Sequence, residues 1–229
     1  EVGGDTDPYR IRNVYTYGTF WGNLPVASEQ DALANATLRP ESITTFEVGA
    51  DLRFFQNRLG LDVAYFDIKS RDQILAVPLE AATGYGSRVI NAGEISTTGW
   101  EAIVTATPVR GDITWKTTLN LSSTLSTVES LADGIDKYQI VSDVFTGDGG
   151  QDLSLEAIVG EAYGQLVGLG FQRVEDTSSP YHGQIIHENG LPLMTNEKVS
   201  AGTFQPDLTF GWSNTIDFDR ISVSMLWSG

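Results

Sequence analysis

The sequence predicts an all-β protein, namely a segment of an antiparallel transmembrane β-barrel with about six full strands. Three observations lead to this prediction. Six segments of about ten residues alternate apolar and polar side chains, three short turns join them in pairs, and long connections separate the pairs. Tight turns on one side and long loops on the other are typical of transmembrane barrels.

The first strand pair is predicted at residues 45–65, where every second residue is apolar. The apolar row of its first strand is Phe46, Val48, Ala50, Leu52 and Phe54. After a turn at residues 56–58, the row continues with Leu59, Leu61, Val63 and Tyr65. Phe66 and Ile68 break the alternation near the far end of this strand, and the connection is expected to begin at Lys69.

Two further pairs show the same alternation. The second covers residues 99–108 and 113–125 with a turn at residues 110–112, and the third covers residues 208–218 and 221–228 with a turn at residues 219–220. Residues 3–43, 69–94 and 128–207 are expected to be long loops. Such lengths are uncommon within a compact soluble domain.

Aromatic side chains are expected in two belts, one at each membrane interface. Those near the short turns are Phe54, Phe55, Trp115 and Phe218. Those expected toward the other interface are Phe46, Tyr65, Trp100, Phe210, Trp212 and Trp227. An aliphatic band between two aromatic belts favours a strand that crosses a bilayer.

Composition excludes several classes of protein. The net charge of −16 argues against nucleic-acid binding, which needs a basic surface. The absence of cysteine excludes disulfides and thiolate metal sites. No run of 18 consecutive apolar residues predicts a transmembrane helix. Alternation alone also fits a soluble or surface-attached β-sandwich that binds glycans, in which the apolar rows would form a dry core between two sheets.

Several motifs resemble the C-terminal barrel region of SusC/RagA-like TonB-dependent outer-membrane transporters. The resemblance extends over nearly the whole chain, in order. It is carried by EVGGDTDPY (1–9), LRPE (38–41), TTFEVGADLRFF (44–55), NRLGLDVAYF (57–66), DQIL (72–75), INAGEI (90–95), VGEAYGQ (159–165) and PDLTFG (206–211). Ala162 departs from the proline that is usual at its position in the family.

The resemblance implies a nutrient importer in the outer membrane of a Bacteroidetes-type bacterium, taking up glycan or peptide fragments. It implies a SusD-like lipoprotein as the lid and a TonB complex as the energy source. Residues 1–229 would form part of one barrel domain, with the plug and TonB-contacting segment outside this sequence and further strands after Gly229. Six strands of roughly 22 cannot close a barrel. No cofactor is implied.

Charged residues of the alternating rows are expected to face the lumen, because a charge on the lipid face is costly. These residues are Glu47, Asp51, Arg53, Asp62, Glu101 and Lys116. Loop aromatics are the candidates for ligand contact, since binding residues concentrate on loops. They are Trp21, Tyr85, Tyr138, Phe145 and Tyr181.

Catalytic and metal chemistry have little support in the sequence, and we do not predict an enzyme. His182 and His187 lie five residues apart in a polar loop and lack further zinc ligands. Asp143, Asp148 and Asp152 are a weak calcium candidate in a glycine-rich loop whose spacing is not that of an EF-hand.

Overall fold

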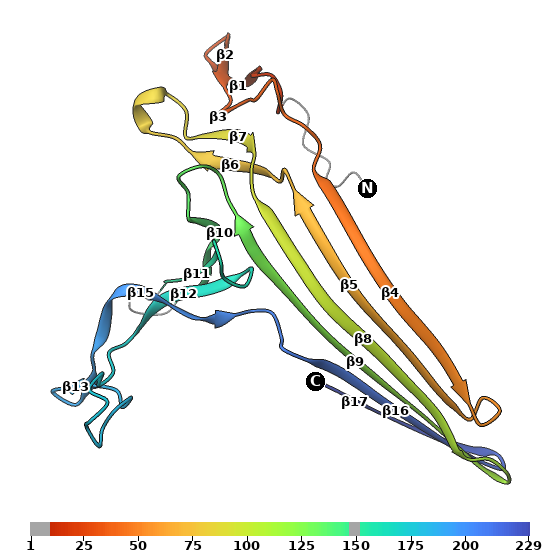
Figure 1. Cartoon of the computed structure of the whole chain (residues 1–229). Helices are drawn as coiled ribbons and strands as arrows, with labels where there is room; N and C mark the ends of the chain where they lie inside the picture. Colours follow the sequence, from red (N-terminus) through yellow and green to blue (C-terminus); the bar gives the residue numbers. More distant parts are fainter. Residues whose placement is uncertain (1–9, 147–151) are drawn as a thin grey trace.

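The computed structural model describes residues 10–146 and 152–229, and its main feature is a six-stranded antiparallel sheet. The strand order is β17-β16-β9-β8-β5-β4, and Figure 1 shows these long strands running together across the molecule. Their bounds are β4 (Ser42–Phe54), β5 (Leu59–Arg71), β8 (Glu94–Val109), β9 (Ile113–Ser130), β16 (Thr209–Phe218) and β17 (Ile221–Ser228). The six predicted strands are confirmed, and we call this sheet the wall.

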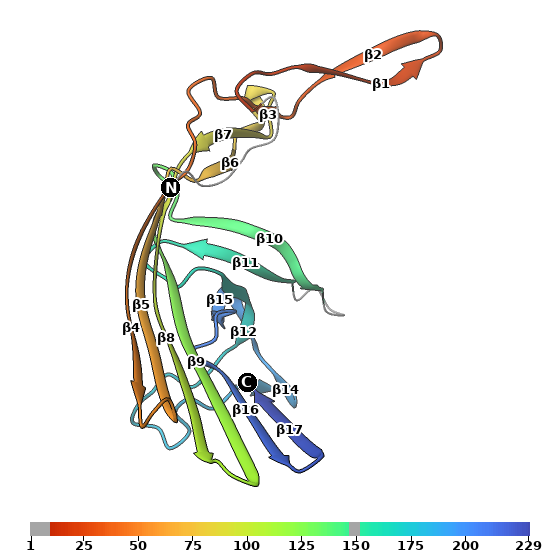
Figure 2. The same ribbon diagram turned by 90° about the vertical axis from the view of Figure 1, so that its right-hand side faces the viewer.

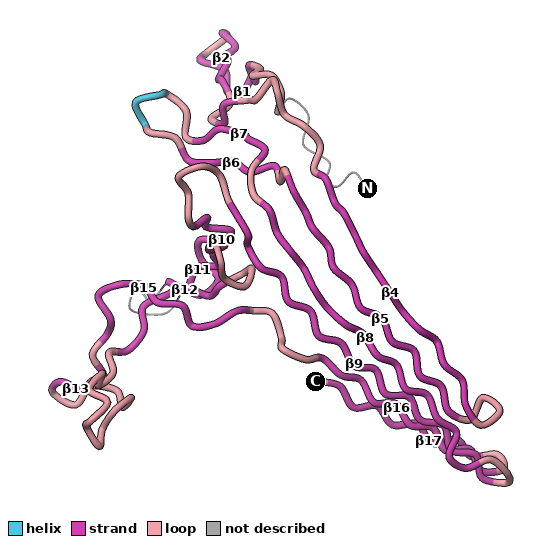
Figure 3. Tube along the Cα trace, in the orientation of Figure 1, coloured by secondary structure: helices cyan, strands magenta, loops and turns pink. Residues whose placement is uncertain are grey.

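Short turns join the wall strands in pairs at one end of the sheet, which we call the turn end. The β4–β5, β8–β9 and β16–β17 connections all lie there, as Figure 3 shows. Arg58 links two of them, because its Nη2 donates to the Pro108 carbonyl at 2.6 Å. The opposite end, where the long connections emerge, is the loop end. The predicted rhythm of short and long connections is confirmed.

The wall register sorts side chains onto two faces. Val48, Tyr65 and Trp100 lie in one cross-strand row, and their neighbours along each strand fall on the other face. These apolar residues stay exposed, Val48 at 56% and Trp100 at 41%. The β-sandwich alternative is therefore wrong, because it required these rows to form a dry core. The two outermost strands, β4 and β17, form the edges of an open sheet.

The wall strands extend further than the alternation predicted. β5 continues to Arg71, slightly beyond Lys69, where the connection was expected to begin. Beyond Tyr65 the pattern inverts: Phe66 turns to the second face and Asp67 to the first. Phe66 is paired with Gly99 and lies where a Cβ on that glycine would be. Apolar residues thus change face where the strand approaches the loop end.

The long connections contain strands of their own, which the sequence analysis did not predict. Residues 10–41 contain a two-stranded hairpin that projects from the loop end, as Figure 2 shows. Residues 72–93 contribute a second hairpin, to which β3 adds in parallel. The elements of these two connections are β1 (Tyr15–Trp21), β2 (Leu24–Glu29), β3 (Ala32–Leu33), β6 (Ile74–Pro78), η1 (Ala81–Thr83) and β7 (Ser87–Asn91).

The third connection forms a four-stranded sheet of order β10-β11-β12-β15, which we call the loop sheet. Its buried positions include polar residues, among them Ser154 and Gln165 at 0% and 6% exposure. The elements are β10 (Lys137–Thr146), β11 (Asp152–Ile158), β12 (Gln165–Phe171), β13 (His187–Glu188), β14 (Leu191–Pro192) and β15 (Met194–Thr203). No helix in the described ranges is long and apolar enough to cross a membrane.

The loop sheet joins the wall along β9. Below Ser122 this strand pairs with β16, whereas above it Val128 exchanges backbone hydrogen bonds with Gly160 and Glu161 at 2.8 and 3.0 Å. Gln205 closes the junction. Its Nε2 donates to the carbonyls of Ser126 and Tyr163 at 3.1 and 2.6 Å, and its Oε1 accepts from the Ser126 amide at 2.8 Å.

Replacing Gln205 with leucine is expected to loosen the loop sheet from the wall. The change leaves the Ser126 amide without its partner in a partly buried place, which costs about 1–3 kcal/mol. The Ser126 and Tyr163 carbonyls each lose one donor but keep the Tyr163 amide and the Thr203 hydroxyl, respectively. Hydrogen exchange in residues 126–128 and 160–163 should rise while exchange in residues 48–63 stays unchanged. The matched control is Gln184→Leu, because the Gln184 side chain makes no hydrogen bond to the described residues. Unchanged hydrogen exchange at residues 126–128 in the Gln205→Leu variant would contradict the proposed role of Gln205 at the junction.

Candidate functional site

The second face of the wall carries the charged residues. The register places all six predicted lumen-facing positions on it. Asp51 stands directly opposite Asp62, and Arg53 relieves this like-charge pair by contacting Asp51 at 2.9 Å. Lys116 lies 3.6 Å from Asp217. All these side chains are exposed, so the ion pairs contribute little to stability; they show a polar, hydrated face.

The apolar face carries a polar cluster that the alternation did not predict. Asn214 occupies a position of the apolar row and is 4% exposed. Its Oδ1 accepts a hydrogen bond from the Trp115 indole at 3.1 Å, and its Nδ2 has no partner among the described residues. Nearby, the Trp212 indole donates to Thr117 at 2.8 Å and stacks on Trp227 with 5.1 Å between centroids. The two indole rings thus pair with the polar atoms of Asn214 and Thr117 on this apolar face.

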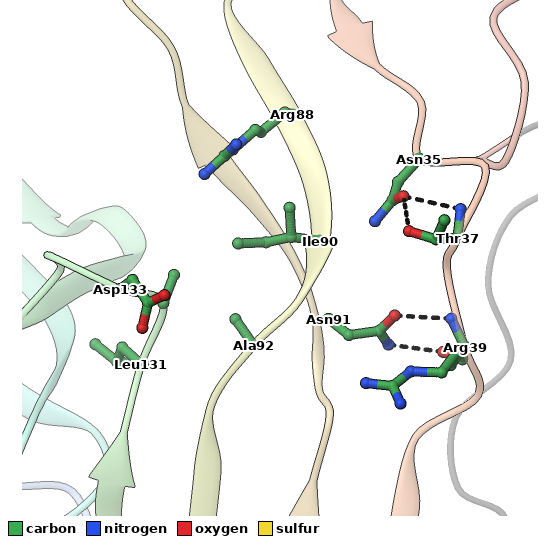
Figure 4. Close-up of a pocket in the computed structure, with 10 residues that line it drawn as sticks. Asn35, Thr37, Arg39, Arg88, Ile90, Asn91, Ala92, Leu131 and Asp133 are labelled. Atoms are coloured by element: carbon green, nitrogen blue, oxygen red, sulfur yellow. Dashed lines mark hydrogen bonds between the residues drawn. The ribbon is translucent and has the colours of Figure 1, made fainter.

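The first candidate site is a cavity of about 510 Å³ at the loop end, shown in Figure 4. It lies between the 34–40 segment, β7 and the 131–133 segment that follows β9. Asn91 holds one side together, since its side chain accepts from the Arg39 amide and donates to the Arg39 carbonyl, both at 2.7 Å. The Asn91 amide nitrogen also donates to the Asp72 carbonyl at 2.9 Å, and this third hydrogen bond fixes the orientation of the amide. The residues lining the cavity are Asn35, Thr37, Arg39, Arg88, Ile90, Asn91, Ala92, Leu131, Ala132 and Asp133.

The two guanidinium groups at this cavity differ. Arg39 is paired with Asp72 at 3.2 Å, so its charge is partly compensated. The Arg88 guanidinium group on β7 makes no ion pair or hydrogen bond with the described residues, and Figure 4 shows it apart from the Asn91–Arg39 pair. Arg39 and Asn91 lie in the 38–41 and 90–95 segments that carry the family resemblance, but none of the lining residues was predicted as a site residue.

The second candidate site is a cavity of about 720 Å³ between β6 and the loop sheet. Glu156 lies in its wall at 8% exposure and accepts a hydrogen bond from Ser154 Oγ at 2.9 Å. Tyr138 reaches across to β6, where its hydroxyl lies 3.4 Å from the Ala76 carbonyl. The lining residues are Ala76, Ile135, Lys137, Tyr138, Gln139, Ile140, Ser142, Glu156 and Lys198.

The predicted ligand-contacting aromatics are not brought together. Tyr138 lines the second cavity, whereas Trp21 is 82% exposed at the tip of the β1–β2 hairpin and Tyr181 is 62% exposed. Tyr85 donates its hydroxyl to Glu29 at 2.7 Å and so ties the base of that hairpin to the 83–86 turn. The Phe145 side chain lies outside the described part of the structure. Ligand contact by these aromatic residues stays a prediction.

The Tyr85–Glu29 contact should respond to pH. The hydrogen bond to Glu29, followed by burial and the carboxylate charge, raises the pKa of Tyr85 above its usual value of 10.0. Because this pKa is raised, the contact is fully present below the usual value and is lost as pH rises through the raised one. The difference in tyrosinate absorbance between the protein and its Tyr85→Phe variant measures the titration. Glu29→Gln should move the Tyr85 titration back toward its usual pH; an unmoved curve would contradict the contact.

Metal ligands do not converge in the part of the chain that the structure describes, where no group of three or more His, Asp or Glu is placed to hold an ion. His187 Nδ1 lies 3.0 Å from the Ile185 carbonyl. Asp148 and the side chains of Asp143 and Asp152 lie outside the described residues, so the calcium candidate stays a prediction.

Comparisons with known proteins agree along the chain. The family model described as TonB dependent receptor-like, beta-barrel, matches residues 9–213. TonB-dependent receptor P26 of Formosa agariphila is 28% identical over 97% of this chain, and TonB-dependent receptor P3 of the same organism is 27% identical over 85%. The chain spans 24% and 21% of the lengths of these two relatives.

Solved structures show the same fold. A chain of the RagAB peptide transporter superposes with a TM-score of 0.70 at 16% identity, covering 95% of this chain and 24% of that one. The RagAB peptide importer in the 'open-open' state gives 0.70 at 17% identity, covering 97% and 24%.

Proposed function

Because this chain belongs to the TonB-dependent receptor β-barrel family, we propose that it forms part of the wall and outer loops of a nutrient importer in the bacterial outer membrane. The single observation that carries this proposal is the two-faced wall. One face exposes an apolar row such as Val48 and Trp100, and the other exposes Asp51, Arg53 and Lys116. A barrel with lipid outside and water inside needs this division.

The wall cannot act alone. Its open edges, β4 and β17, would leave backbone groups unpaired in lipid, at several kcal/mol for each group. The chain therefore supplies one arc of a larger barrel domain, and the plug and TonB-contacting segment belong to other parts of the protein. The relatives, about four times longer than this chain, are consistent with that division.

The proposed cargo is a glycan or peptide fragment, delivered through a SusD-like lipoprotein lid and imported with energy from a TonB complex. The RagAB structures support this assignment because they are described as a peptide transporter and importer with 'open-open' and 'closed-closed' states. The loop-end cavities of about 510 and 720 Å³ are large enough to hold parts of such fragments. The family transports rather than catalyses, and we propose no enzymatic step.

The test uses the full-length protein extracted from outer membranes in mild detergent. A closed barrel should migrate differently on gels before and after boiling, and a surface lipoprotein should co-purify with it. A heat-modifiable band with a lipoprotein supports a lidded importer, whereas a heat-modifiable band alone supports the barrel and removes the lid. A protein that stays soluble without detergent would overturn the proposal.

A further inference from the structure

The second cavity gathers cations from the most acidic part of the chain. Residues 128–206 contain twelve Asp/Glu and only three Lys/Arg. Two of those three, Lys137 and Lys198, lie 61 positions apart in sequence yet line the same cavity. β10 carries one and β15 the other, at opposite edges of the loop sheet.

Neither ammonium group is compensated by the described residues. The Lys137 and Lys198 side chains make no ion pair or hydrogen bond within that part of the chain. Glu156, in the same lining, is occupied by Ser154 Oγ at 2.9 Å and lies beyond ion-pair distance of both. Two unpaired ammonium groups in the lining of one cavity give that cavity a positive potential within an otherwise acidic segment. This lining favours an anion in the cavity.

Resting on the proposed function, we propose that this cavity binds a carboxylate group of the imported fragment. The rest of the lining suits the polar remainder of such a ligand. Gln139 offers an amide, and Tyr138 presents a ring whose hydroxyl lies 3.4 Å from the Ala76 carbonyl. Ammonium groups bind carboxylates with charge-assisted hydrogen bonds, which are about twice as strong as neutral ones.

A second cation stands next to this cavity. Arg88 is paired in register with Val77 of β6, the residue after Ala76, and makes no ion pair with the described residues. The 131–135 segment borders both cavities. A fragment with more than one carboxylate can therefore occupy the second cavity and extend toward Arg88.

A third cavity provides an internal contrast. It has a volume of about 950 Å³ and is lined by Glu175, Asp176 and Glu197. Its single cation, Arg173, donates to the Gly183 carbonyl at 2.8 Å. The cation preference is thus specific to the cavities beside β6 and β7 and is not shared by every cavity at the loop end.

The experiment measures dissociation constants for the full-length transporter by calorimetry. One pair of probes is a uronic-acid tetrasaccharide and its neutral hexose counterpart, and the other is a tetraglutamate peptide and its tetraglutamine counterpart. In at least one pair, the acidic probe should bind about tenfold tighter or more, the size expected for one charged hydrogen bond. Raising the salt from 50 to 300 mM should weaken that preference.

Variants assign the preference to this cavity. The double change Lys137→Gln and Lys198→Gln should weaken the acidic probe about tenfold and leave the neutral probe unchanged. Glu156→Gln should have the opposite effect and strengthen binding of the acidic probe several-fold, because it removes a repelling charge. Lys69→Gln is the matched control, since Lys69 is exposed on the apolar-row face of β5 and lines none of the three cavities.

Each result decides the matter. A preference for uronate or for glutamate, lost in the lysine variant, supports the inference and identifies the source of the carboxylate. Equal binding of acidic and neutral probes, or a preference that survives the double variant, overturns it. These failures would leave a lidded importer intact, whereas a protein that is not in the outer membrane would remove both proposals.

Discussion

Replacing Val48 with arginine is expected to abolish assembly of the barrel. Val48 is 56% exposed in the middle of β4, on the face assigned to lipid, between Phe46 and Ala50 of the same row. An arginine near the bilayer midplane costs about 2–4 kcal/mol, and it would stand on an edge strand of this arc. The measurement is the amount of heat-modifiable full-length protein in the outer-membrane fraction.

Two comparisons make the result specific. Val104→Arg, on the same face of β8, should fail in the same way. Lys116→Ala should assemble normally, because it removes a charge from the opposite face and breaks only the exposed 3.6 Å pair with Asp217. Full assembly of the Val48→Arg protein would count heavily against the assignment of this face to lipid.

Gly99→Val is expected to have the second large effect, because the wall has no room for a side chain at this position. A Cβ there would lie 2.7 Å from the Ser123 carbonyl oxygen and would meet the Phe66 ring. The ring can move but the β9 backbone cannot, so strain of about 1–3 kcal/mol or more should fall on the β8–β9 pairing. Thermal unfolding of the detergent-extracted protein should occur at lower temperature, with less folded protein recovered.

The control is Gly211→Ala on β16, where the nearest atom to an added Cβ is Asn120 Nδ2 at 3.9 Å. This variant should unfold at the normal temperature. Adding Phe66→Ala to Gly99→Val should recover only part of the loss, since the Ser123 contact remains. If Gly99→Val unfolded normally, the close packing of Phe66 on this glycine would be wrong.

The wall could be predicted from sequence because one physical constraint acts on every residue of it. A strand with lipid on one side and water on the other must alternate apolar and polar side chains. The pattern of residues 45–54 therefore predicts both the strand conformation and the face of each side chain. The break in the alternation at Phe66 has a packing reason, because Phe66 covers Gly99 on the second face. The strand continues while the pattern inverts.

The loop sheet escaped prediction because its strands follow no such rule. Its interior holds polar residues beside the apolar Ala157 and Val167. Ser200 donates to Gln165 Oε1, and the Ser154 hydroxyl lies 2.9 Å from Glu156 and 3.1 Å from the Val167 carbonyl. Hydrogen bonds between distant residues hold these groups inside, so hydrophobic alternation gives no signal. The sequence shows that residues 128–206 are acidic, but it does not show that two of their lysines line the same cavity.

The candidate sites were predictable only in part. Tyr138 was singled out as a loop aromatic and lines a cavity, but the cations beside it come from β10 and β15 and carry no motif. Asn214 shows the converse. A polar residue in an apolar row looks like an interruption in sequence, and its burial follows only from its packing beside Trp115 across the β9–β16 pair.

The double partnership of β9 constrains the timing of folding. The turn-end half of β9 pairs with β16, and its loop-end half pairs with residues 160–163. Both partners follow β9 in sequence and are therefore synthesised after it. Ser126 and Gln205 are 79 residues apart, and closing so wide a loop is entropically unfavourable unless the intervening chain is already compact. The loop sheet is thus expected to fold before the last hairpin docks. Until that hairpin docks, the backbone groups of β9 that later pair with β16 stay unpaired. They can bind the insertion machinery or another chain during this interval.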